Sequence, residues 1–270
     1  MPRFAANLSM LFTEYPFLER FDHAAASGFA AVEFLFPYDQ DIDGIGKALR
    51  RNNLEQVLFN LPAGDFSRGE RGYANDPSRA AEFREGVALA LDIAQRLTCG
   101  HLNCLVGLQL SGVPLERQWD SVRANLAYAA DQAATAGIRQ VVEPLNRFDA
   151  PGFLLGTSGQ GFDLVEQIGH PNLSLQYDLY HAQRTEGNLT RTIEQRLPLI
   201  GHIQIADSPD RHQPGTGEIN YPFVLNALDQ AGYDGWVSLE YNPRGTSAES
   251  LQWLTEWGYV SRESLPGTSA

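Results

Sequence analysis

The sequence has few of the features that mark several large protein classes. Its two cysteines, Cys99 and Cys104, are too few for a disulfide framework and lack the CxxC spacing of many metal sites. We interpret both as buried thiols. No run of ~18 apolar residues is present, and the polar segment 4–10 does not form the apolar region of a signal peptide. These absences argue against a transmembrane helix and predict a cytoplasmic protein.

Positive charge is also scarce. The chain has 20 Lys and Arg against 33 Asp and Glu, a formal net charge of −13. Because phosphate contacts need clustered basic side chains, this balance predicts no nucleic-acid partner, and it also argues against an anionic membrane surface. A small anionic substrate stays compatible, since the field at one site can differ from the net charge. The composition is that of an ordinary globular protein and is compatible with a homo-oligomer.

One pattern repeats along the chain: a short apolar run ends in a polar residue, and a segment with apolar residues at helical spacing follows. The expected strands are Arg3–Asn7, Ala31–Leu35, Gln56–Asn60, His101–Val106, Arg139–Glu143, Leu173–Asp178, Gly201–Ile205 and Trp236–Glu240. The expected helices are Glu14–Ser27, Ser78–Leu97, Leu115–Ala136, Gly159–Ile168, Leu189–Leu197, Pro222–Ala231 and Ala248–Trp257. Such alternation favours a parallel sheet covered by helices.

Eight strand–helix units in 270 residues give about 34 residues per unit, close to the length of a βα repeat. They predict an α/β fold, a single (β/α)8 TIM barrel over residues 1–260, with a short tail at 261–270. The alternative is a doubly wound open sheet, which favours a glycine-rich phosphate loop after the first strand. Asn7–Met10 is not such a loop, and Gly44-Ile45-Gly46 follows no expected strand and lacks a third glycine.

A polar residue stands at or near the end of every expected strand. In chain order these residues are Asn7, Glu33, Asn60, Asn103, Glu143, Asp178, Gln204 and Glu240. Chemistry in such barrels occurs at the carboxyl ends of the strands, and burial of polar groups without partners is costly. The eight residues therefore predict a ring around one polar site, although a plain loop boundary explains the three asparagines equally well.

Four of these residues, from four consecutive strands, predict a metal site: Glu143, Asp178, Gln204 and Glu240. Three carboxylates that converge on one cavity repel one another unless a cation is present. Ligands that are all oxygen atoms suit Mg²⁺ or Mn²⁺ better than Zn²⁺. Three carboxylates around a divalent ion leave one negative charge in excess, which is available as a base. The alternative is a set of separate helix-capping or salt-bridged carboxylates.

Two histidines lie close to this set in the sequence. His181 follows Asp178 by three residues, and at the rim of a barrel it can donate a proton or a hydrogen bond. A structural histidine is the alternative for this position. His202 precedes Gln204 by two residues and shares its face of the strand, so we expect it to pack in a lower layer of the barrel.

Two long loops, residues 61–72 and 207–220, follow the third and the seventh expected strands. Loops of this length in a compact domain often bind the substrate or close over it. Their arginines Arg68, Arg71 and Arg211 are candidates for holding a substrate carboxylate. Solvated surface arginines are the alternative.

Most of these polar residues belong to longer motifs. The motifs are Arg3–Phe12, Val32–Tyr38, Asn60–Asp65, Val141–Asn146, Gln176–His181, Gly201–Asp207, Pro214–Tyr221 and Gly235–Tyr241. Together they resemble the hydroxypyruvate isomerase family, and the resemblance extends from Pro2 to about Trp257. It implies a xylose isomerase-like barrel. Members of this family isomerise hydroxypyruvate to tartronate semialdehyde, and a close branch isomerises 2-oxo-tetronates to 3-oxo-tetronates.

The resemblance also implies roles for individual residues. Glu143 and Glu240 match the acid–base pair of the family. With Asp178 and Gln204 they match its metal site, in which related sugar epimerases have a histidine in place of Gln204. His181 and Arg211 match substrate-contacting positions of those epimerases. Apart from the resemblance, Asn7, Glu33 and Asn60 are expected at the substrate from their places at strand ends, and Arg71 from its place in the first long loop. Asn242 is a departure, because the family often has a lysine there, and this bears on the choice of substrate.

The implied reaction is a proton shift between adjacent carbons of a small anionic hydroxy-oxo acid. One glutamate removes a proton from the hydroxyl-bearing carbon, the other returns one to the former carbonyl carbon, and Mg²⁺ or Mn²⁺ stabilises the enediolate. A ketose 3-epimerase, an endonuclease on the same barrel and a non-catalytic binding barrel are the alternatives. The net charge and Gln204 argue against the endonuclease, and the intact carboxylate set argues against the binding barrel.

Overall fold

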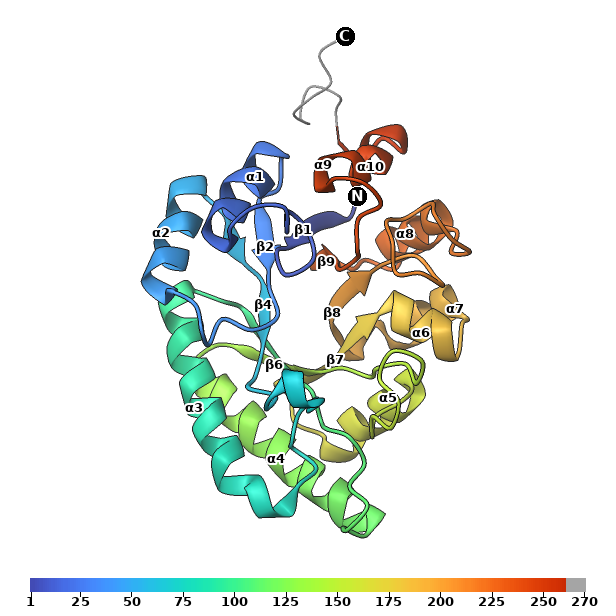
Figure 1. Ribbon diagram of the computed structural model, residues 1–270. Helices are drawn as coiled ribbons and strands as arrows, with labels where there is room; N and C mark the ends of the chain where they lie inside the picture. The colour runs from blue at the N-terminus through green and yellow to red at the C-terminus, as the bar shows by residue number, and fades with distance from the viewer. Residues whose placement is uncertain (261–270) are drawn as a thin grey trace.

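The computed structural model describes residues 1–260, which form a ring of parallel strands enclosed by helices (Figure 1). The strands are β1 (Arg3–Asn7), β2 (Ala31–Glu33), β3 (Glu55–Gln56), β4 (Leu58–Asn60), β5 (His101–Cys104), β6 (Arg139–Val142), β7 (Leu173–Asp178), β8 (Ile200–Ile205) and β9 (Trp236–Leu239). Neighbours pair in the order β3-β2-β1-β9-β8-β7-β6-β5-β4, and each of these ladders is parallel.

β3 and β4 together occupy one position of the barrel. Only Val57 separates them; its N–H donates to the Val32 carbonyl at 2.9 Å, and its carbonyl accepts from the His101 N–H at 3.0 Å. β3 pairs with β2 on one side, and β4 pairs with β5 on the other. The nine strands therefore close a barrel of eight positions, which confirms the predicted TIM barrel.

The helices lie outside the strand ring (Figure 1). They are α1 (Arg20–Ala26), α2 (Ile42–Asn52), α3 (Ala80–Leu97), α4 (Leu115–Thr135), α5 (Ser158–Ile168), α6 (Leu179–Thr185), α7 (Leu189–Arg196), α8 (Tyr221–Gln230), α9 (Ser247–Ser250) and α10 (Gln252–Glu256). Short 3-10 turns add Phe17–Glu19, Phe66–Arg68, Pro77–Arg79 and Leu197–Leu199. Within residues 1–260, no helix combines the length and the apolar character that a membrane crossing needs.

The sequence pattern does not predict two of these helices, α2 and α6. α2 contains Gly44 and Gly46, which are poor helix formers. Its start and its end are set by the residues that cap it. The Asp41 side chain accepts the Gly44 N–H at 3.0 Å at the first turn, and Asn53 ends the helix in the left-handed conformation. The pattern does not separate α6 from β7, because α6 begins at Leu179, directly after the last residue of the strand, with no loop between them.

The core divides into an apolar layer between strands and helices and a polar interior near the carboxyl ends of the strands. The buried polar residues of that interior include each of the expected strand-end residues. The barrel therefore brings the predicted ring to one end of one sheet. The predicted tail, residues 261–270, lies outside the described residues, so the domain limits 1–260 stay a prediction.

Candidate active site

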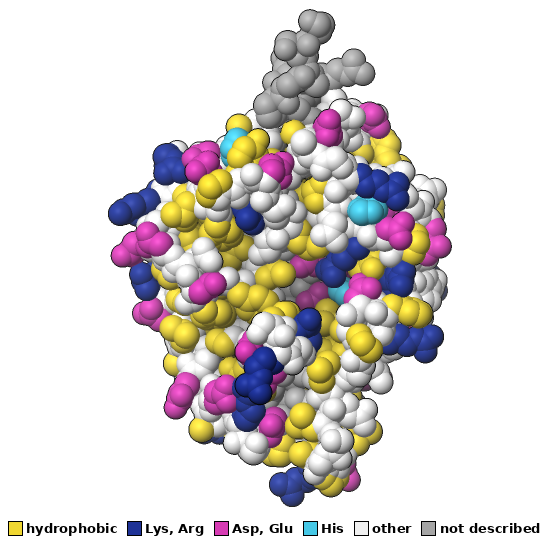
Figure 2. Space-filling view, viewed as in Figure 1, with side chains coloured by type: hydrophobic (Ala, Val, Ile, Leu, Met, Phe, Trp, Pro, Cys, Tyr) yellow, Lys and Arg dark blue, Asp and Glu magenta, His cyan; other side chains and the backbone are white. Residues whose placement is uncertain are grey.

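Three carboxylates stand at the carboxyl ends of β6, β7 and β9. Glu143 directly follows β6, Asp178 ends β7, and Glu240 directly follows β9. Their exposed fractions are only 5%, 3% and 4%. Figure 2 shows acidic side chains and a histidine at the bottom of a hollow near the centre of the face viewed. The structure therefore brings the three predicted carboxylates to the mouth of one barrel.

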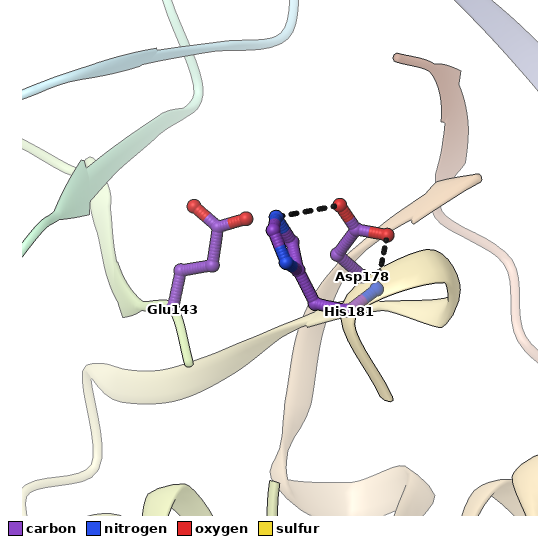
Figure 3. Close-up of side chains that lie close together, drawn as sticks. All are labelled: Glu143, Asp178 and His181. Carbon is purple, nitrogen blue, oxygen red and sulfur yellow. Dashed lines mark hydrogen bonds and ion pairs between the residues drawn. The ribbon is translucent and has the colours of Figure 1, made fainter. Parts of the chain in front are cut away.

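Asp178 uses one oxygen to start α6 and leaves the other free. Its Oδ1 accepts the N–H of Tyr180 at 2.8 Å and that of His181 at 3.4 Å. Its Oδ2 is buried and has no hydrogen-bond partner; His181 Nε2 lies 3.6 Å away and a nitrogen of the cationic Arg211 lies 3.7 Å away. Ligand atoms of Glu143, Asp178 and His181 lie within 4.8 Å of one another, with the His181 ring between the two carboxylates (Figure 3). A buried carboxylate oxygen without a partner fits a cation.

His181 is fixed in one tautomer by the segment after β6. Its Nδ1 accepts the backbone N–H of Asn146 at 3.1 Å and lies 2.7 Å from the Asn146 side-chain nitrogen. A backbone N–H only donates, so in a neutral ring the proton is on Nε2. Burial, followed by the charges of Arg211 and Arg184, holds the pKa of His181 well below its usual value. His181 thus presents an N–H to the hollow, whereas a metal-bound histidine uses a bare nitrogen and donates with the other.

Arg211 joins two of the carboxylates. It donates to Glu240 Oε2 at 2.5 Å, lies 3.7 Å from Asp178 Oδ2 and covers the face of the Tyr180 ring. On its other oxygen, Glu240 accepts the Asn7 side-chain N–H at 3.3 Å. Of the three predicted loop arginines, Arg211 is the one that contacts the carboxylates.

All three carboxylates have raised pKa values. Burial, followed by the charges of Glu240 and Asp178, raises the pKa of Glu143 well above its usual range, while a hydrogen bond from the Gln176 side chain opposes this shift. Burial raises the pKa of Glu240 to about 8, against the lowering effect of Arg211. Burial also raises the pKa of Asp178. Buried acids that hold a proton near neutral pH are suited to acid–base chemistry.

The remaining predicted residues lie at different depths. Asn60 reaches Glu143 through Asn103, whose side-chain N–H group donates to Asn60 Oδ1 at 3.0 Å and to Glu143 Oε2 at 2.9 Å. Gln204 and Glu33 are fully buried, and the strand register pairs Gln204 with Asp178. The Gln204 side chain donates to Glu33 Oε1 at 2.7 Å and accepts the Gln176 side-chain N–H at 2.6 Å, and its role as a ligand stays a proposal.

Arg71 has a different surrounding from Arg211. Its guanidinium lies 4.2 Å from the centre of the Phe66 ring and donates to the carbonyls of Phe66 and Glu70 within its own loop. The structure shows no contact between Arg71 and the carboxylates, and its substrate contact stays a prediction.

Sequence reasoning missed two supporting residues, Asn146 and Gln176. Both belong to the motifs that carry the family resemblance. Gln176 precedes Asp178 by two residues and so shares its face of β7, which was an available signal. Asn146 had no such signal, because only the fold of the loop after β6 brings it to His181.

Comparisons with known proteins show the family to which the chain belongs. The family model described as xylose isomerase-like TIM barrel matches residues 21–257. The hydroxypyruvate isomerase of Escherichia coli strain K12 is 48% identical over 254 residues, which cover 94% of this chain and 98% of that protein. A 2-oxo-tetronate isomerase of Cupriavidus necator is 42% identical over 254 residues, with the same coverage of 94% and 98%.

Solved structures show the same fold. A crystal structure from Brucella melitensis described as AP endonuclease, family 2, is 47% identical, with a TM-score of 0.92 over 95% of this chain and 99% of that one. A structure of L-ribulose 3-epimerase is 26% identical, with a TM-score of 0.74 over 97% of this chain and 88% of that one.

Proposed function

Because this chain belongs to the hydroxypyruvate isomerase family of xylose isomerase-like TIM barrels, we propose that it isomerises small hydroxy-oxo acids, and in the first place hydroxypyruvate to tartronate semialdehyde. The observation that carries the proposal is the pair of buried glutamates, Glu143 and Glu240, at one barrel mouth. Both have raised pKa values, so each can hold or accept a proton near neutral pH.

The donor set at this mouth fits a divalent cation. Three buried carboxylates converge there, and Asp178 Oδ2 has no hydrogen-bond partner. We propose that Glu143, Asp178, Gln204 and Glu240 hold Mg²⁺ or Mn²⁺, since their ligand atoms are oxygens. When bound, such an ion supplies Lewis-acid stabilisation of negative charge on the substrate oxygens. The tautomer of His181 argues against its use as a ligand.

Two glutamates carry out the two proton transfers at carbon. One glutamate takes a proton from the hydroxyl-bearing carbon, which leaves an enediolate, and the other returns a proton to the former carbonyl carbon. A second proton, that of the hydroxyl group, moves from one substrate oxygen to the other. The reaction is therefore an isomerisation without net oxidation. His181 donates its Nε2–H to a substrate oxygen, and Arg211 supplies positive charge beside Glu240.

A 2-oxo-tetronate is the alternative substrate. The chain is 42% identical to a 2-oxo-tetronate isomerase, which supports a second acid of the same chemical class. Asn242, where the family often has a lysine, is exposed next to the site and donates its backbone N–H to the Arg211 carbonyl at 2.8 Å. Unlike a lysine, Asn242 carries no charge that could pair with a substrate carboxylate. An assay with both acids therefore decides between a three-carbon and a four-carbon substrate.

A substrate panel tests the proposal. Purified protein is assayed with hydroxypyruvate, 2-oxo-tetronates and free ketoses, with Mg²⁺ or Mn²⁺, before and after chelation. We expect turnover of hydroxy-oxo acids, loss on chelation and recovery when the ion is returned. Turnover of ketoses alone would instead indicate a 3-epimerase, and activity that chelation leaves unchanged would remove the metal from the proposal.

Glu143→Gln tests the chemistry within the same assay. It removes one acid–base group, so kcat should fall by ~10²–10⁴-fold while the circular dichroism spectrum stays unchanged. Glu116→Gln is the matched control, because Glu116 lies on the exposed first turn of α4 and carries the same charge change. Turnover of Glu143→Gln close to that of the control would contradict the mechanism.

A further inference from the structure

Glu33 is a buried carboxylate from which two chains of side-chain amides begin. It lies at the end of β2 and has no exposed surface. Its Oε1 accepts the side-chain N–H groups of Gln204 at 2.7 Å and Asn7 at 2.8 Å, and its Oε2 bonds to His202 Nε2 at 2.8 Å. The carboxylate is thus surrounded by three donors from two other strands, Asn7 on β1 and His202 and Gln204 on β8.

Each amide chain leads to one of the two glutamates. Asn7 donates to Glu33 and also to Glu240 Oε1 at 3.3 Å. On the other side, Gln204 Oε1 accepts the side-chain N–H of Gln176 at 2.6 Å, and the Gln176 side chain lies near enough to Glu143 to lower the pKa of that carboxyl as a donor. One buried carboxylate is therefore connected to both candidate acid–base groups.

The direction of these hydrogen bonds follows from Glu33. A carboxylate only accepts, so the Gln204 amide must turn its nitrogen to Glu33 and its oxygen to Gln176. Gln176 must then turn its nitrogen to Gln204, which leaves its own oxygen buried without a partner. A reversed Gln176 would set its oxygen against that of Gln204. Because the Gln176 oxygen gains no hydrogen bond in this orientation, the orientation of the Gln176 amide is set by Gln204 and not by a partner of its own oxygen.

We propose that Glu33, anchored by His202, is a positioning residue that makes the amides beneath the site present N–H groups to both glutamates. The inference rests on the proposed function, and it gives Glu33 an indirect role in place of the direct substrate contact expected from the sequence. It also gives His202 a role beyond packing. The glutamine chain is the more sensitive one, because the oxygen of Asn7 is held separately by the Ser9 backbone N–H at 3.0 Å.

Glu33→Gln is the direct test, because it keeps the size of the side chain but adds a donor. The Gln204 and Gln176 amides can then reverse, which places an oxygen against Glu143. We expect kcat to fall by ~10–100-fold, as for other residues that orient catalytic groups, with KM nearly unchanged. The kinetic isotope effect with hydroxypyruvate deuterated at the hydroxyl-bearing carbon should increase. A mutation that only unfolds part of the protein lowers kcat but leaves this isotope effect as it is.

Variants at His202 separate anchoring from packing. His202→Gln keeps an N–H near the position of Nε2 and should retain most activity, whereas His202→Leu should resemble Glu33→Gln. His101→Leu is the matched control: the His101 ring centre lies 6.0 Å from that of His202, and its hydrogen bond goes to the Val57 carbonyl and not to Glu33. Equal losses in His101→Leu and His202→Leu would overturn the role of His202.

A measurement without substrate keeps this inference separate from the proposed function. In protein labelled with ¹⁵N-glutamine, the side-chain NH₂ groups of Gln204 and Gln176 should exchange slowly with solvent. Glu33→Gln should speed this exchange, and His101→Leu should not. If exchange is unchanged in Glu33→Gln, or if kcat and the isotope effect are those of an active wild type, the inference is wrong. An inactive wild type with the expected exchange pattern would overturn only the proposed function.

Discussion

Replacing Asp207 with asparagine should loosen the loop that carries Arg211. Asp207 is buried at the start of this loop, residues 207–220. Its side chain accepts five backbone N–H groups, those of Ser208 and Ile219 at Oδ1 and those of Gly215, Thr216 and Gly217 at Oδ2. Gly217 permits this closure, because a Cβ there would lie 2.0 Å from the Ser208 carbonyl oxygen.

The magnitude follows from the number of acceptor oxygens. An asparagine has one, so in its best orientation it keeps the three bonds of one oxygen and loses the two of the other. A hydrogen bond to a charged group contributes ~1.5–3 kcal/mol, so the loop should lose at least ~3 kcal/mol of local stability. At ~1.4 kcal/mol per tenfold change, the amides of Ser208 and Ile219, which lose their acceptor, should exchange about 100-fold faster.

Native-state hydrogen exchange measures this change. Asp210→Asn is the matched control, because Asp210 lies in the same loop, is exposed and only approaches Arg244 at 3.5 Å. The kcat/KM of Asp207→Asn should fall as well, since the loop places Arg211 on Glu240. Exchange at Ser208 and Ile219 that is no faster than in the control would refute the reasoning.

Two further predictions concern histidines. His181→Phe should lower kcat but change the Mn²⁺ dissociation constant, measured by electron paramagnetic resonance, by less than ~10-fold, because the ring offers an N–H and not a ligand atom; a larger loss of affinity would show that His181 is a ligand. Burial, followed by the charge of His202, lowers the pKa of His101 from 6.5 to about 4. The unfolded chain therefore binds more protons between these values, so the stability from this group is complete above pH 6.5 and is lost as pH falls toward 4. Unfolding by urea across this range should show a shallower decline in His101→Leu, and parallel curves would contradict the assignment.

The sequence by itself determined the fold and the membership of the polar ring. Strand and helix periodicities are local properties, and each unit could be recognised where its own residues show one period clearly. In a parallel barrel the carboxyl ends of all strands lie on the same side, so the sequence alone predicts that Glu143, Asp178 and Glu240 lie close together. The sequence does not predict α2, because its glycines obscure the helical pattern. The hydrogen bond from the Gly44 N–H to Asp41 that starts this helix is visible only in the folded backbone.

Only the tertiary structure decided how the ring divides by depth and direction. Side-chain packing sets exposure: Glu33 and Gln204 are fully buried, although the register pairs Gln204 with Asp178 and Glu33 with Asn7 at the strand ends. Loop closure sets which arginine contacts the site, and Asp207 places Arg211 there while Arg71 lies on Phe66. The donor face of His181 depends on Asn146, 35 residues earlier in the chain. These features depend on contacts between distant segments, and hydrogen-bond direction is fixed only once each donor has met its acceptor.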